Sequence, residues 1–182
     1  MDYRTQMKKT GSLILIAFCV LLPLAPLLRG NFYAVGDMRD VFIPLEKFFR
    51  SQQLAGHIPS WNPDIAWGFP VIASAQIGFF YPPLLISRFL PLEIYLPLIL
   101  TLHLVFAAYG TYVFAQKLGQ SQLASCFSAL SFTLGAYLTQ HISHLNIVLT
   151  VAWLPWQLLV AHHLALRKKI SFLWLLNMIY VP

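Results

Sequence analysis

Residues 92–115, LEIYLPLILTLHLVFAAYGTYVFA, decide the fold of this chain. A helix of about 20 predominantly apolar residues crosses the hydrocarbon core of a bilayer. The stretch reaches that length and carries an acid, Glu93, only near its beginning. It also holds His103, and an ionisable group inside a membrane helix is a functional candidate, although a neutral histidine bonded to a neighbouring helix is the favoured interpretation. Residues 92–115 therefore predict a transmembrane helix.

Apolar runs on both sides of this stretch predict further membrane helices. The run 12–28 would reach about 25 Å as a helix, and it follows a basic amino terminus, so it predicts a first span. A signal peptide has a similar pattern, but Pro23 and Pro26 interrupt the run and no A-x-A cleavage site follows it. The runs 124–138 and 145–166 predict a third and a fourth span.

The last residues, 170–182, begin a fifth apolar segment that is too short for a crossing. We therefore expect an all-α polytopic membrane protein with about four transmembrane helices and a partial fifth. The chain 1–182 is expected to form a single membrane domain, or the amino-terminal part of a larger one. The segment 30–91, between the first two spans, is expected to be a loop that carries interfacial amphipathic helices.

Composition and charge support this class and exclude others. Of the 182 residues, 58% are hydrophobic and 10% are charged, whereas a soluble domain has about 25% charged residues. The net charge of +6 comes from basic residues beside the apolar runs, which indicates membrane topology and contact with lipid headgroups, so no nucleic-acid partner is expected. The short basic segments predict a cytoplasmic amino terminus, with the loop 30–91 outside a plasma membrane.

The loop contains a predicted amphipathic helix. Its apolar residues at helical spacing are Val41, Phe42, Leu45, Phe48 and Phe49. Its other side carries Glu46, Lys47 and Arg50, and Glu46 with Arg50 forms a favourable pair one turn apart. Asp40 is well placed as the N-cap and Gly56 as the end of this helix. Such a helix is expected to lie in the membrane interface, and residues 84–90 predict a second, shorter one.

Five of the six acidic residues lie between Gly36 and Glu93, so they gather in this loop. The sequence Gly36-Asp37 opens the cluster. Further along the loop come Pro59-Ser60-Trp61-Asn62-Pro63, Gly68-Phe69-Pro70 and Phe80-Tyr81-Pro82-Pro83, and Trp153-Leu154-Pro155 follows in the fourth span. Together these motifs, in this order, resemble the YfhO family, which is similar to membrane glycosyltransferases of the GT-C type. The resemblance covers nearly the whole chain, but only the amino-terminal part of a usual family member.

The resemblance implies an activity. Such enzymes take a sugar from a polyprenyl-phosphate carrier and pass it to a glycan, lipid or protein acceptor outside the cytoplasmic membrane. Asp37 matches the family's acid near the start of the first external loop, and Asp40 would be the second acid. The acceptor hydroxyl needs a base, for which Asp37 is suited. The departing phosphate needs a nearby cation, for which Arg39 is a candidate. No metal site and no cofactor are implied, and turnover is expected of a full-length parent rather than of this length of chain.

Four further residues are candidates for substrate binding. His141 and His144 stand three residues apart on the external side, a spacing that suits a metal or a phosphate. No third ligand is evident, so a polar cap at the interface is the favoured interpretation. Trp61 and Trp67 are expected to anchor the loop at headgroup depth, and either indole could stack on a sugar. For Asp37 the alternative role is stabilisation of a turn, and for Asp40 the helix cap is favoured.

Two other functions fit the same membrane class. A transporter or lipid flippase would concentrate ionisable residues inside the spans, whereas here they lie mostly in the loop. A non-catalytic remnant or assembly module would keep the helices without the chemistry. Both alternatives stay open from the sequence.

Overall fold

A computed structural model of the chain describes residues 3–28, 36–74, 76 and 78–166. Over these ranges the regular structure is helical and contains no strand, which confirms the all-α prediction. Asn62 and Phe69 form an isolated antiparallel bridge within the loop. The predicted start of a fifth span, 170–182, lies outside the described residues.

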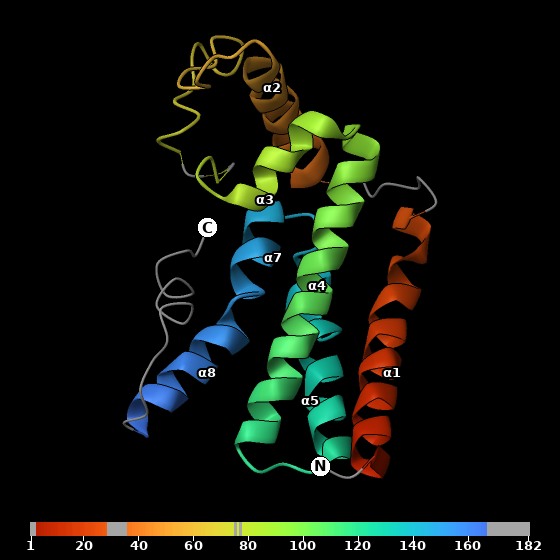
Figure 1. Ribbon diagram of the computed structural model, residues 1–182. Helices are drawn as coiled ribbons and strands as arrows, with labels where there is room; N and C mark the ends of the chain where they lie inside the picture. Colours follow the sequence, from red (N-terminus) through yellow and green to blue (C-terminus); the bar gives the residue numbers. More distant parts are fainter. Residues whose placement is uncertain (1–2, 29–35, 75, 77, 167–182) are drawn as a thin grey trace.

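The helices follow one another with a long irregular segment between α2 and α3 (Figure 1). Their bounds are α1 Tyr3–Leu28, η1 Met38–Phe42, α2 Ile43–Leu54, α3 Pro82–Leu85, η2 Ile86–Phe89, α4 Leu92–Lys117, α5 Gln122–Thr133, α6 Ala136–Gln140, α7 Leu145–Val151 and α8 Leu154–Ala165. The first of the η segments is a π-helical turn and the second a 3₁₀ turn.

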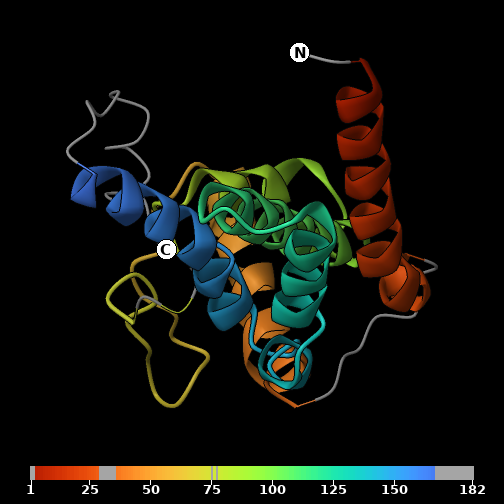
Figure 2. The same cartoon turned by 90° about the horizontal axis from the view of Figure 1, so that it is seen from below.

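Helix α4 is the centre of the bundle because it is apolar around its whole circumference. It contacts α1 and α5 on one side and α7 and α8 on the other (Figures 1 and 2). The main core joins Tyr95, Leu96 and Leu100 of α4 to side chains of α1, α6 and α7. Gly110 lets α8 approach closely, since a Cβ atom there would lie 2.5 Å from the indole nitrogen of Trp156.

Two described stretches are long and apolar enough to cross a membrane: α4, and Leu145–Ala165, which contains α7 and α8. The described apolar part of α1, Thr10–Leu22, is shorter. The range 124–138, predicted as one span, is divided between α5 and α6 because Gly135 is extended, with ψ of 160°. The range 145–166 bends before α8, where Pro155 supplies no amide hydrogen to the preceding turn.

The amphipathic helix of the loop exists, but two predictions about it were wrong. Asp40 does not cap it, because the chain is already helical from Met38 onward and the N-cap of α2 is Phe42. Glu46 does not face solvent with Lys47, because it is 1% exposed. Arg50 donates a hydrogen bond to the carbonyl oxygen of Leu90.

Helix α2 is covered on two faces, which explains why Glu46 is buried. Leu45 and Phe49 pack with Val71 of the irregular segment in a small second core. Phe42, just before α2, belongs to the main core around α4. A polar residue on the face between these two contacts is enclosed even though the helical pattern assigns it to the solvent side. The second loop helix, predicted at 84–90, begins two residues earlier at Pro82.

Candidate functional site

Asp37 lies directly before the π-helical turn η1, where Gly36 adopts a φ of 57°. The carbonyl oxygen of Gly36 accepts hydrogen bonds from the amides of Arg39 and Asp40, at 3.0 and 3.1 Å. The Asp37 side chain forms no capping bond to this turn. Its carboxylate therefore remains available to a partner elsewhere in the chain.

That partner is His144, at the start of α7. The Nε2 atom of His144 lies 3.2 Å from Oδ2 of Asp37, and the two side chains are 34% and 55% exposed. The Nδ1 atom of His144 lies 3.3 Å from Oγ of Ser143. A neutral imidazole with its hydrogen on Nε2 satisfies both contacts: it donates to the carboxylate and accepts from the serine hydroxyl. The structure thus brings together two of the residues that the sequence nominated.

His141 and Tyr137 extend this group. The Tyr137 and His141 rings are stacked with centroids 4.5 Å apart, and the His141 and His144 rings are 5.3 Å apart. His141 Nδ1 lies 2.7 Å from the carbonyl oxygen of Tyr137 and donates to it. We call Asp37, Tyr137, His141 and His144 the polar cluster. Among the described residues, no three His, Cys, Asp or Glu side chains are arranged to hold a metal ion.

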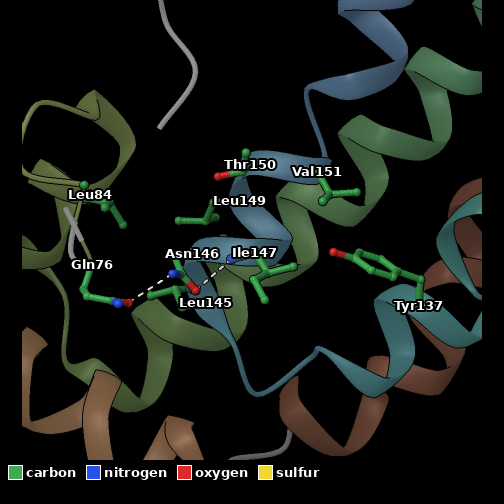
Figure 3. Close-up of a pocket in the computed structure, with 10 residues that line it drawn as sticks. Gln76, Leu84, Tyr137, Leu145, Asn146, Ile147, Leu149, Thr150 and Val151 are labelled. Atoms are coloured by element: carbon green, nitrogen blue, oxygen red, sulfur yellow. Dashed lines mark hydrogen bonds between the residues drawn. The ribbon is translucent and has the colours of Figure 1, made fainter. Parts of the chain in front are cut away.

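A cavity of about 330 Å³ adjoins the polar cluster (Figure 3). Ten residues line it: Gln76, Gly78, Leu84, Tyr137, Leu145, Asn146, Ile147, Leu149, Thr150 and Val151. Tyr137 belongs to both the cluster and the cavity, and Asn146 follows His144 by two residues. A molecule in the cavity would therefore contact Tyr137 of the polar cluster and the turn of α7 that follows His144, whereas Asp37 and His144 themselves do not line the cavity.

The polar end of the cavity is a pair of amides. Nδ2 of Asn146 donates to Oε1 of Gln76 at 3.0 Å, and Oδ1 of Asn146 accepts from the amide of Ile147 at 2.9 Å. Figure 3 shows Gln76 and Leu84 facing α7 from the loop side, with Tyr137 at the opposite side. Apart from Tyr137, Thr150 and Gly78, the remaining lining is aliphatic, so the cavity is a mainly apolar space with hydrogen-bonding groups at its ends.

Arg39 and Asp40 are engaged with each other. Nε of Arg39 lies 2.7 Å from Oδ1 of Asp40, and the side chains are 65% and 58% exposed. The hydrogen bond from Arg39 lowers the pKa of Asp40. Each side chain therefore neutralises the other. Asp40 is less suited to act as a second base, and Arg39 is less suited to bind a phosphate, while this ion pair is formed.

The two loop tryptophans do not line the cavity. The Trp61 indole covers Gly68, where a Cβ atom would lie 2.1 Å from the ring. Trp67 is fully exposed and adopts a left-handed φ of 67°. Trp61 therefore holds the turn that the Asn62–Phe69 bridge closes, and Trp67 projects away from it.

The sequence did not predict that two of the quoted motifs meet on α4. Tyr81, of the Phe-Tyr-Pro-Pro motif, places its hydroxyl 2.5 Å from Nε2 of His103. Nε1 of Trp153, of the Trp-Leu-Pro motif, donates to the same hydroxyl at 2.9 Å. Nδ1 of His103 donates to the carbonyl oxygen of Ile99 at 2.8 Å, so Nε2 accepts from Tyr81.

This network clarifies the role of His103. Its two nitrogens are both used, as expected for a neutral buried imidazole, although its partner is Tyr81 of the loop rather than a neighbouring membrane helix. The contact fixes α3 and the bend between α7 and α8 against the central helix. It therefore positions two walls of the cavity.

The polar cluster and the cavity contain the candidate functional residues of the described chain. Asp37, His141 and His144 were predicted as site residues from the sequence. Tyr137, Gln76 and Asn146 were identified only from the structure. Comparison of the chain with protein-family models, with curated proteins and with solved structures gave no match.

Proposed function

We propose that this chain is a membrane glycosyltransferase, or the amino-terminal part of one. It would transfer a sugar from a polyprenyl-phosphate donor to an acceptor outside the membrane, with Asp37 as general base. The observation that carries the proposal is the Asp37–His144 contact of 3.2 Å, formed at the start of the helix α7 that lines the cavity. The motif resemblance to the YfhO family supplies the reaction class.

The arrangement suits base catalysis. One carboxylate oxygen of Asp37 faces His144, and the half-exposed side chain leaves the other oxygen open to a substrate. The acceptor hydroxyl would transfer its proton to Asp37 as its oxygen attacks the anomeric carbon. The bond from that carbon to the phosphate oxygen would break, and the polyprenyl phosphate would leave with the electron pair. His144 orients the carboxylate through its Nε2 hydrogen.

Membrane placement is part of the proposal. We propose a multi-pass protein of the plasma membrane with a cytoplasmic amino terminus and the loop 30–91 outside. Large apolar side chains on the outer faces of the bundle are exposed, as a lipid environment requires. They include Ile14, Phe18, Ile94, Leu102, Leu123 and Phe127. Helices α2 and α3 and the start of α7 lie at the same end of the bundle (Figure 1).

Replacement of Asp37 tests the catalytic assignment. The protein would be expressed from its own gene at its natural genomic position, and membranes that contain it would be prepared. These membranes would be incubated with polyprenyl phosphate carrying radiolabelled glucose, mannose or N-acetylhexosamine. We expect Asp37→Asn to lower transfer to endogenous acceptors about 100-fold or more, the usual contribution of a general base.

The matched control is Asp64→Asn, which makes the same change at another exposed loop aspartate. It should transfer at the parental rate. Equal membrane abundance of the two variants, measured by immunoblot, excludes loss of protein as the cause. Parental activity of Asp37→Asn would remove the catalytic role, and absence of transfer by the parent with every donor would remove the proposed function.

A further inference from the structure

The cavity beside the polar cluster has a lining that limits what it can bind. None of its ten residues carries a carboxylate, an ammonium, a guanidinium or an imidazole group. Five aliphatic side chains line it: Leu84, Leu145, Ile147, Leu149 and Val151. The space is partly open, so a charged group bound there would lose part of its hydration and gain no counter-ion. The cavity therefore does not suit the phosphate of a donor.

The amide pair does suit a neutral hydroxyl group. Each primary amide carries two N–H donors and a carbonyl with two lone pairs. The Asn146–Gln76 bond uses one donor of Asn146 and one lone pair of Gln76. The remaining amide hydrogens can donate to a hydroxyl oxygen, and the remaining lone pair of Gln76 can accept its hydrogen. An alcohol or a sugar hydroxyl provides both functions in one group.

The volume sets the size of the bound part. Ligand sites in proteins span about 300–1,000 Å³, and this cavity of about 330 Å³ is at the lower end of that range. It would hold a head group with the first carbons of a chain. An aliphatic wall on α7 continues from Leu145 to Val151 and would contact those carbons.

The position of the cavity relates this ligand to the reaction. Asn146 lies within one helical turn of His144, and Tyr137 joins the cavity to the ring stack. A hydroxyl group held at the amide pair would thus lie in the same helical turn as His144, the partner of Asp37. This neighbourhood favours an acceptor, and the absence of positive charge in the lining argues against a donor site.

We infer that the cavity binds an uncharged amphiphile through a hydroxyl-bearing head group, and that this amphiphile is the acceptor. The acceptor role rests on the proposed function, whereas the binding does not. The head group lies against Gln76 and Asn146, and the apolar chain leaves along α7. The donor phosphate stays outside the cavity.

Photo-crosslinking tests the binding without any transfer reaction. The purified protein in phosphatidylcholine nanodiscs would be irradiated with a diacylglycerol that carries a diazirine near its head group, and labelled peptides would be mapped by mass spectrometry. We expect labelling within Leu145–Val151. Unlabelled diacylglycerol or dodecyl glucoside should compete, and phosphatidic acid, which differs from diacylglycerol by a phosphate, should not. Stronger competition by one of the two neutral probes tells a lipid alcohol from a glycolipid.

Variants then assign the contact to the amide pair. Gln76→Leu and Asn146→Leu should each reduce labelling about fivefold, the loss of one neutral hydrogen bond. Gln140→Leu, the same change at an exposed glutamine beyond the cavity lining, is the matched control. Thr150→Phe, which places a ring in the cavity, should abolish labelling. Competition by phosphatidic acid, or unchanged labelling in the two amide variants, would overturn the inference.

The result is separable from that of the transfer assay. Asp37→Asn should retain the labelling, because Asp37 does not line the cavity. Labelling with the expected specificity but without any transfer by the parent would remove the proposed function and the acceptor role, and would leave the binding site. If sugar transfer depends on Asp37 but no photo-crosslinking is found within Leu145–Val151, the inference about the cavity is wrong and the proposed function stands.

Discussion

The carboxyl group of Glu46 is enclosed between α2 and the central helix. Neither of its oxygens has a hydrogen-bond partner among the described residues, and the hydroxyl group of Tyr95 on α4 is likewise buried without one. Burial raises the pKa of Glu46 from 4.5 to about 8. An acid in such a place is neutral near pH 7, because the charged form would lose its hydration.

This raised pKa predicts that stability depends on pH. Below pH 4.5 Glu46 is protonated in both the folded and the unfolded chain, so it contributes no penalty. Between pH 4.5 and about 8 the unfolded chain releases the proton while the folded chain keeps it, so stability falls as the pH rises. The slope is about 1.4 kcal/mol per pH unit at most.

Glu46→Gln should remove that slope. The variant should match the parent at pH 4.5 and exceed it at pH 8 by a few kcal/mol, on the order of 2–4. Urea unfolding in detergent micelles, followed by circular dichroism at several pH values, measures the difference. Glu93→Gln, at an exposed acid in the first turn of α4, should leave the pH dependence as it is. A parent whose stability is flat from pH 5 to 8 would contradict the prediction.

At the scale of elements, the Tyr81 hydroxyl joins α3, α4 and the bend between α7 and α8. Burial raises the pKa of Tyr81, so the hydroxyl stays protonated and donates to His103. Tyr81→Phe would leave Nε2 of His103 and Nε1 of Trp153 without this partner. An unsatisfied buried polar group costs about 1–3 kcal/mol, and we expect a loss of that size in thermal unfolding.

A double-mutant cycle shows whether the loss belongs to this contact. Trp153→Phe removes the indole donor, so the two changes together should cost less than the sum of the single changes. Tyr109→Phe, at an exposed tyrosine of α4, should be close to neutral. Additive losses for Tyr81 and Trp153 would show that the hydrogen bond does not couple the elements.

The elements also show what a sequence can predict. The start of α4 at Leu92 was predicted because an apolar run follows a proline, and that signal is local. The break at Gly135 was missed because its extended backbone depends on the turn after α5. Glu46 was wrongly predicted to face solvent, because helical periodicity identifies a single covered face. Helix α2 has two covered faces. The Asp37–His144 contact joins segments far apart in the chain, so no spacing could reveal it.

At the scale of the whole molecule, the proposed orientation makes its own prediction. A reporter enzyme that is active only outside the cytoplasm, fused after Trp67, should be active, because the loop 30–91 is placed outside. The same reporter fused after Gln120, in the turn between α4 and α5, should be silent. This turn follows the carboxyl end of α4, which the proposed topology places on the cytoplasmic side of the membrane, so it serves as the control. Silence after Trp67 would reverse the topology.

The pairing of Asp37 with His144 has a consequence for the order of biosynthesis. The acid emerges from the ribosome early, whereas the imidazole follows only after α4, α5 and α6 have been made. A contact between distant segments forms late, because the intervening chain must first be ordered. The nascent protein therefore carries Asp37 without this partner while the chain from α2 to α6 is made, and the polar cluster is assembled only when α7 packs against the central helix.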